Sequence, residues 1–140
     1  MTSLHLERTL PYKRGNQPTI VVRLAYGDCQ IDTEAMLDTG ASVCVFDASL
    51  AHVLGVPLTR GRQVPIVGLD GTIRPAPLVL LDLTVLPVSA GISLGQIPIA
   101  FLDGIQRTVG NLLGRQRFFS AVDLGLSHAR RTIHLGLSSV

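Results

Sequence analysis

The tetrapeptide Asp38-Thr39-Gly40-Ala41 is the part of this sequence whose residue types and spacing best suit catalysis. A carboxylate stands at the end of a run with alternating apolar residues, beside a small hydroxyl residue and a glycine that permits a tight turn. Two carboxylates held close together share one proton, so one can activate a water molecule while the other acts as an acid. Asp-Thr-Gly occurs once in the 140 residues. A catalytic pair of this kind therefore requires two copies of the chain.

The same residues also suit an ordinary turn. Asp, Thr and Gly are all common in turns, where an aspartate accepts hydrogen bonds from backbone N–H groups. Taken alone, Asp38 is therefore either a catalytic acid or a turn aspartate.

Other candidate sites are weaker. The four histidines and two cysteines show no metal-ligand spacing, so we expect neither a metal nor a cofactor. Cys44 lies in an apolar run, where a thiol is usually inert, and two cysteines are too few for a disulfide framework. We expect both Cys29 and Cys44 to be reduced and buried.

The elements that would position Asp38 are mostly strands. Proline and glycine punctuate the chain and helical periodicity is scarce, which favours a mostly β fold. The pattern predicts a short helix that begins after an Asp47 cap and ends at Gly55, and a second short helix at 115–120. Pro75 and Pro77 mark an irregular or edge strand. The expected strands are 19–24, 31–38, 63–67, 72–74, 78–86, 96–102, 122–126 and 131–135.

Length and composition indicate one domain and exclude several functions. Hydrophobic residues make up 46% of the chain, yet no apolar stretch is long enough to cross a membrane. The net charge is only +2 and the basic residues are scattered, so nucleic acid is not an expected partner. The N-terminus lacks the pattern of a signal peptide, which predicts a cytoplasmic protein. Residues 1–18 are interpreted as an N-terminal arm with freedom to move, and residues 19–140 as the folded domain.

Three segments in a fixed order resemble the retropepsin-like (retroviral-type) aspartic proteases. They are Leu37-Asp38-Thr39-Gly40-Ala41-Ser42, a glycine-tipped hairpin at Gly68 to Thr72, and Leu112-Leu113-Gly114-Arg115. The resemblance covers about residues 19–137. It implies a mostly β, closed-barrel-like acid-protease domain with one or two short helices, in a symmetric homodimer.

The resemblance also implies roles for individual residues. Asp38 would be the catalytic acid, one from each subunit, and Thr39 would brace the two loops across the symmetry axis. Gly40 would donate a backbone hydrogen bond to the carboxylate, with Ala41 completing the loop. Further from the loop, Leu112, Leu113 and Gly114 would pack beneath it, and the tip residues Gly68, Leu69, Asp70 and Gly71 would form a flap over the substrate. Asp70 departs from the small or apolar residues usual there, and the residues alone also fit an ordinary surface hairpin.

These features predict a dimeric aspartic endopeptidase. It would need no metal and no cofactor, and its partners would be a second copy of the chain and an extended peptide or protein substrate. Two alternatives remain at this point. One is a catalytically silent dimeric module that binds peptides or a partner in the same groove. The other is a structural β-domain within an assembly.

Overall fold

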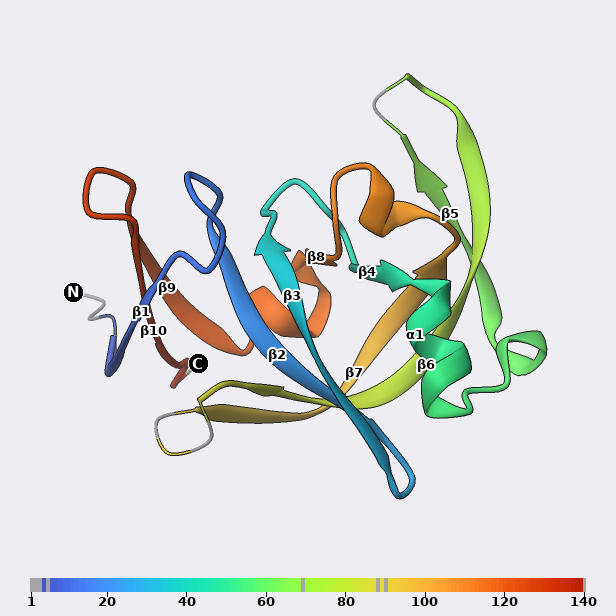
Figure 1. Ribbon diagram of the computed structural model, residues 1–140, viewed down its shortest axis with the longest axis horizontal. Helices are drawn as coiled ribbons and strands as arrows, with labels where there is room; N and C mark the ends of the chain where they lie inside the picture. The colour runs from blue at the N-terminus through green and yellow to red at the C-terminus, as the bar shows by residue number, and fades with distance from the viewer. Residues whose placement is uncertain (1–3, 5, 69, 88, 90, 140) are drawn as a thin grey trace.

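The computed structural model describes residues 4, 6–68, 70–87, 89 and 91–139, and most of them lie in strands (Figure 1). The mostly β fold predicted from the sequence is confirmed. The strands are β1 (Arg8–Pro11), β2 (Thr19–Tyr26), β3 (Cys29–Leu37), β4 (Cys44–Asp47), β5 (Arg62–Val67), β6 (Ile73–Val85), β7 (Ile92–Leu102), β8 (Leu112–Leu113), β9 (Val122–Ser127) and β10 (Thr132–Leu137). The helical segments are α1 (Ala48–Leu54) and the short turns η1 (Leu58–Arg60), η3 (Ile105–Arg107) and η4 (Arg115–Phe119).

The strands form two sheets. A three-stranded sheet has the order β1-β10-β9, and a seven-stranded sheet has the order β2-β3-β8-β4-β7-β6-β5. β2 also pairs with β6, so the larger sheet returns on itself. The pairs β3–β8 and β4–β7 are parallel, whereas the other pairs are antiparallel.

The core lies inside this curved sheet. Alternate residues of β2 and β6 point inward, while all four residues of β4 are buried, as expected for a strand covered on both faces. Leu113 of β8 is also fully buried. The largest fully buried side chains are Ile20, Leu24, Phe46, Leu54, Leu81, Leu83, Ile97, Ile99, Phe101, Leu113, Phe118 and Ile133.

The helix expected after Asp47 is confirmed. The Asp47 side chain accepts a hydrogen bond from the Ser49 N–H, and Gly55 ends α1 in the left-handed conformation with φ 74°. Among the helices of the described residues, none is long and apolar enough to cross a membrane.

Part of the predicted N-terminal arm lies in a sheet. β1 pairs antiparallel with β10 from Arg8, opposite Leu135, to Pro11, opposite Thr132. The Tyr12 N–H then donates to the Arg131 carbonyl at 2.8 Å. Residues 8–12 are therefore attached along the closing hairpin.

Three local predictions were wrong. The segment at 115–120 is one irregular turn rather than a helix, because Gln116 and Arg117 have non-helical backbone angles, with φ 70° at Arg117. The N–H groups of Arg115 and Gln116 donate to the carbonyls of Ala41 and Ser42. β6 runs unbroken from Ile73 to Val85, so the strands expected at 72–74 and 78–86 are one strand. The edge strand expected at Pro75 and Pro77 is confirmed, because β6 before Leu78 pairs with β5 but not with β7. Cys29 is exposed because it begins β3 directly after the hairpin turn.

Candidate active site

Asp38 follows the last residue of β3, and its loop leads back into the sheet through β4. The two-residue strand β8 lies between β3 and β4, parallel to the first and antiparallel to the second. The N–H of Met36 donates to the Asn111 carbonyl at 2.8 Å, and that of Asp38 donates to the Leu113 carbonyl at 3.0 Å. β8 therefore fixes the backbone at the position where the carboxylate emerges.

The loop turns tightly around the Asp38 side chain. The Ala41 N–H donates to the Asp38 carbonyl at 3.1 Å, and the Gly40 N–H donates to Asp38 Oδ1 at 2.9 Å. Within the described chain, Gly40 is the one hydrogen-bond partner of this carboxylate. Asp38 is half-buried, while Thr39 and Gly40 are exposed in the single chain. The carboxylate is thus oriented by the backbone and keeps a free oxygen, Oδ2, for a further partner.

Gly114 allows the loop to lie directly on the end of β8. A β-carbon at this position would collide with the carbonyl of Val43 and would stand 2.9 Å from the Ala41 carbonyl oxygen. Since both neighbours are backbone atoms, no side-chain rotation could relieve the contact. The segments of the two sequence motifs, 38–43 and 112–114, are therefore in direct contact.

Arg115 holds the loop from the other side. Its backbone N–H donates to the Ala41 carbonyl at 2.9 Å, and its Nη1 donates to the Thr39 carbonyl at 2.8 Å. Arg115 is the last residue of the second motif, but its type and position predicted no role for its side chain. The motif indicates that the segment at 112–115 lies against the Asp38 loop, but not that the Arg115 side chain reaches the Thr39 carbonyl.

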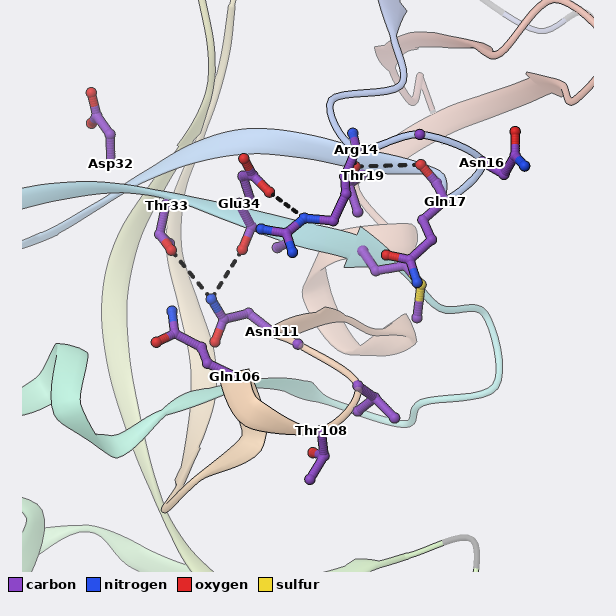
Figure 2. Close-up of a pocket in the computed structure, with 15 residues that line it drawn as sticks. Arg14, Asn16, Gln17, Thr19, Asp32, Thr33, Glu34, Gln106, Thr108 and Asn111 are labelled. Carbon is purple, nitrogen blue, oxygen red and sulfur yellow. Dashed lines mark hydrogen bonds and ion pairs between the residues drawn. The ribbon is translucent and has the colours of Figure 1, made fainter.

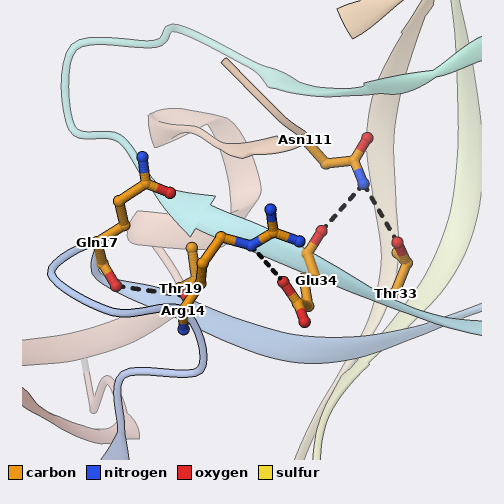
Figure 3. Close-up of polar contacts among 6 residues, drawn as sticks. All are labelled: Arg14, Gln17, Thr19, Thr33, Glu34 and Asn111. Atoms are coloured by element: carbon orange, nitrogen blue, oxygen red, sulfur yellow. Dashed lines mark hydrogen bonds and ion pairs between the residues drawn. The ribbon is translucent and has the colours of Figure 1, made fainter. Parts of the chain in front are cut away.

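Asn111 connects the strands beneath the loop and was also missed. Its Nδ2 donates to the Glu34 carbonyl at 3.0 Å and to Thr33 Oγ1 at 3.2 Å (Figure 3). Its Oδ1 accepts from the Asp47 N–H at 2.9 Å. Asn111 is only 3% exposed, so these bonds satisfy a buried amide and tie β3 to β4. A polar residue directly before an apolar pair is the one signal that could have identified it.

Asp47 extends this network to the neighbouring turn. Its Oδ1 accepts from the Ser49 N–H at 3.0 Å, and its Oδ2 accepts from the Gln106 N–H at 3.1 Å. Burial raises the pKa of Asp47, but the hydrogen bonds from Ser49 and Gln106 outweigh it, and the pKa lies below its ordinary value. Asp47 thus stays ionised while it supports the floor of the site.

Cys44 packs under the loop as an inert thiol. It is fully buried, and burial raises its pKa to about 11, against the smaller lowering effect of the Gly114 N–H, which donates to Sγ at 3.4 Å. A thiol of this kind is protonated at neutral pH and is no nucleophile. The described residues contain no group of three or more His, Cys, Asp or Glu residues that could hold a metal.

The β5–β6 hairpin has a tight, polar tip. The Gly68 N–H donates to the Thr72 carbonyl at 2.8 Å, and Asp70 Oδ1 accepts from the Thr72 hydroxyl at 2.6 Å and from its N–H at 3.0 Å. These bonds lower the pKa of Asp70, the hydroxyl contributing most. Gly71 has φ 83°, which favours glycine. Leu69 lies outside the described residues.

The predicted site residues thus fall into two groups. The loop at 38–41 contacts the segment from Leu112 to Gly114 through Asp38 and Ala41, whereas Gly68, Asp70 and Gly71 form a separate hairpin tip. In Figure 1 the 38–43 loop, the 14–17 turn and the β5–β6 hairpin all project at the upper edge of the molecule. The tip makes no hydrogen bond to the Asp38 loop within the described chain.

Comparison with known proteins identifies the family. A family model described as aspartyl protease matches residues 21–116, which include the Asp38 loop, the hairpin and β8. The chain belongs to the aspartyl protease family. No curated protein sequence matches it.

A solved structure shows the same fold. The chain is similar to a retropepsin-like aspartic protease from Rickettsia conorii, with a TM-score of 0.62, 18% sequence identity and coverage of 96% of each chain. EIAV protease in complex with an inhibitor matches with a TM-score of 0.41 and 22% identity, over 76% of this chain and 88% of that chain. The retropepsin-like resemblance inferred from the sequence is confirmed for this aspartyl protease family member.

Proposed function

We propose that this protein is a homodimeric aspartic endopeptidase in which two Asp38 carboxylates, one from each subunit, activate a water molecule. The observation that carries the proposal is the geometry of Asp38. Its backbone is fixed by Leu113, its Oδ1 is held by the Gly40 N–H, and its loop lies exposed at one edge of the molecule. An aspartate that served only as a turn cap would have no need for the supporting contacts from Gly114 and Arg115.

The proposed mechanism follows from the pairing of like charges. Two carboxylates at the dimer axis would hold one proton between them, because both cannot ionise easily at close range. The ionised member would accept a proton from water as the water attacks the peptide carbonyl, and the protonated member would donate to the developing oxyanion. Thr39, whose side chain is exposed next to Asp38, would brace the two loops.

The β5–β6 hairpin is the proposed flap over an extended peptide. Val67 and Ile73 oppose each other below its tip and are 65% and 66% exposed. Two large apolar side chains exposed as a pair gain from contact with a substrate or the second subunit. Closure of the hairpin would exclude water from the site.

A peptide cleavage assay tests the proposal. We expect the protein to cleave a mixed peptide library at some pH between about 3 and 7, and Asp38→Asn to lower cleavage by about 10²–10⁴-fold. A statine-type inhibitor should block the same activity. Asp28→Asn, in the exposed β2–β3 turn, serves as the matched control and should cleave normally. No cleavage at any pH would favour the catalytically silent peptide-binding module instead.

A subunit-mixing experiment tests the shared site. When an equal amount of Asp38→Asn protein is added to a fixed amount of the unchanged protein and the subunits exchange, the active homodimers should fall to about half. Activity that stays constant would show that each subunit works alone. Sedimentation measurements should find a dimer, and a strict monomer at high concentration would exclude the proposed pair.

A further inference from the structure

A pocket that contains an ion pair lies along β3 next to Asp38. It has a volume of about 840 Å³ and is bounded by the 14–17 turn, by β3 from Asp32 to Met36 and by the segment at 106–111 (Figure 2). Met36 is two residues before Asp38, so the pocket borders the proposed catalytic centre. A peptide that crosses Asp38 would therefore present one of its nearby side chains to this pocket.

Arg14 and Glu34 form an ion pair in the pocket that leaves some of their hydrogen-bonding atoms without a protein partner among the described residues. Arg14 Nε donates to Glu34 Oε2 at 3.0 Å, so the side chain of the 14–17 turn reaches over β3 (Figure 3). The Arg14 side chain is 70% exposed and that of Glu34 is 35% exposed. Within the described part of the chain, neither Nη atom of Arg14 donates to a protein group and Glu34 Oε1 accepts from none. The pair thus offers free donors beside a free acceptor.

The neighbouring pair, Arg23 and Asp32, is different. Arg23 Nε donates to Oδ1 at 2.7 Å and Nη2 donates to Oδ2 at 3.1 Å. Both carboxylate oxygens are engaged and the two residues stand opposite each other on β2 and β3. This pair needs no further partner, whereas Arg14 and Glu34 remain open to one.

The rest of the pocket is lined by both polar and apolar residues, and its charges balance. Asn16, Gln17 and Gln106 line it, and so do the apolar residues Met36 and Val109. The charges of Arg14 and Glu34 oppose each other, and Arg23 balances Asp32. A charged ligand would meet a like charge as well as an opposite one, and an apolar ligand would remove water from both charged groups without replacing their hydrogen bonds.

A carboxamide fits this arrangement. Its oxygen can accept from an Arg14 Nη while its NH₂ group donates to Glu34 Oε1, so both free groups are satisfied without a net charge. We propose that the pocket receives a glutamine or asparagine side chain of the substrate, within a few residues of the cleaved bond. The inference rests on the proposed endopeptidase function and adds a preference to it.

The test uses peptide libraries and charge-reversed variants. In the unchanged protein, glutamine or asparagine at one position near the cleaved bond should raise kcat/KM about tenfold over glutamate, lysine or leucine. Arg14→Glu should shift the preference at that position to lysine or arginine, and Glu34→Arg to aspartate or glutamate. The double variant should restore the amide preference, because a carboxamide can rotate to exchange its donor and acceptor.

Controls separate the pocket from general charge and folding effects. Arg130→Glu, in the exposed β9–β10 turn, changes the net charge by the same amount as Arg14→Glu and should leave the profile unchanged. Thermal melting establishes that each variant is folded. If a charge-reversed variant does not fold, Arg14→Gln and Glu34→Gln are used in its place. Each of these should reduce the amide preference severalfold. Cleavage with no amide preference, or a profile that the reversals do not move, would overturn the inference and leave the proposed function intact.

A binding measurement keeps the inference testable without catalysis. If the unchanged protein cleaves nothing, the proposed function fails. Fluorescence anisotropy with labelled peptides then tests whether the pocket prefers an amide side chain. Glutamine-containing peptides should then bind about tenfold more tightly than their glutamate or leucine counterparts, and Arg14→Glu should remove the difference. Equal affinities would refute the pocket assignment.

Discussion

Gly114 and Val43 meet backbone to backbone beneath the Asp38 loop, so that a β-carbon on Gly114 would collide with the Val43 carbonyl. The Ala41 carbonyl oxygen would stand 2.9 Å from the same atom. The loop can lie this close to β8 only because Gly114 has no side chain. This contact links the two sequence motifs physically, because one motif supplies the carboxylate and the other supplies the space for its loop.

Gly114→Ala should therefore displace the loop. We expect the free energy of unfolding to fall by about 1–3 kcal/mol, since the new methyl group must push aside fixed backbone. Any peptidase activity should fall more steeply, because small displacements of a catalytic group reduce rates strongly. Urea unfolding and peptide cleavage measure the two effects. Gly125→Ala is the matched control: its β-carbon would meet the mobile end of Leu6 at 3.0 Å, so a similar loss there would contradict this account.

Asn111→Ala should destabilise the floor of the site. The change removes three side-chain hydrogen bonds, to Thr33, to the Glu34 carbonyl and from the Asp47 N–H. At about 1 kcal/mol for each bond, the free energy of unfolding should fall by about 2–4 kcal/mol. Chemical denaturation measures it. Asn16→Ala, at an exposed position, should change stability by less than about 0.5 kcal/mol, and an equally small effect at Asn111 would show that water replaces its bonds.

Local patterns in the sequence predicted the elements whose causes are local. The Asp47 cap and Gly55 define α1 because capping and a left-handed residue act within one turn. The hairpin at 62–74 and the closing hairpin at 122–137 follow from alternation around turn residues. Asp38 could be identified from the sequence as a candidate catalytic residue for the same reason, since a carboxylate in a tight turn at a strand end is a local arrangement.

Contacts between distant segments could not be predicted in this way. β8 has only two residues, so no periodicity identifies it, yet its pairing with β3 and β4 supports the site. The roles of Arg115 and Asn111 depend on which carbonyls stand opposite them after folding. The turn at 115–119 makes such contacts as well, because the N–H groups of Arg115 and Gln116 donate to the carbonyls of Ala41 and Ser42, and a helix pattern in the sequence does not reveal them.

The two cysteines should differ sharply in reactivity. Cys29 is exposed, whereas Cys44 is fully buried with its pKa raised to about 11, so only about one thiol in a thousand would be ionised at pH 8 even if reached. A disulfide reagent such as DTNB should label one thiol in the native protein and two in urea. In Cys29→Ser, rapid native labelling should disappear. Its persistence would mean that the Asp38 loop opens readily and exposes Cys44.

Asp47 should make the stability of the protein depend on pH. Because its pKa in the folded state lies below the unfolded value of about 3.9, its contribution is complete above that value and is lost as the pH falls through the folded pKa. Asp47→Ala should reduce the free energy of unfolding by about 0.5–2 kcal/mol at pH 7, mainly through the lost cap, and the difference should shrink below about pH 4. Asp47→Asn keeps a capping oxygen without a charge, so its stability should lack this pH dependence. Unfolding curves measured from pH 2 to pH 7 test the three proteins together. A deficit of Asp47→Ala that stays constant down to pH 2 would show that the ionised form of Asp47 is not what supports the turn at Gln106.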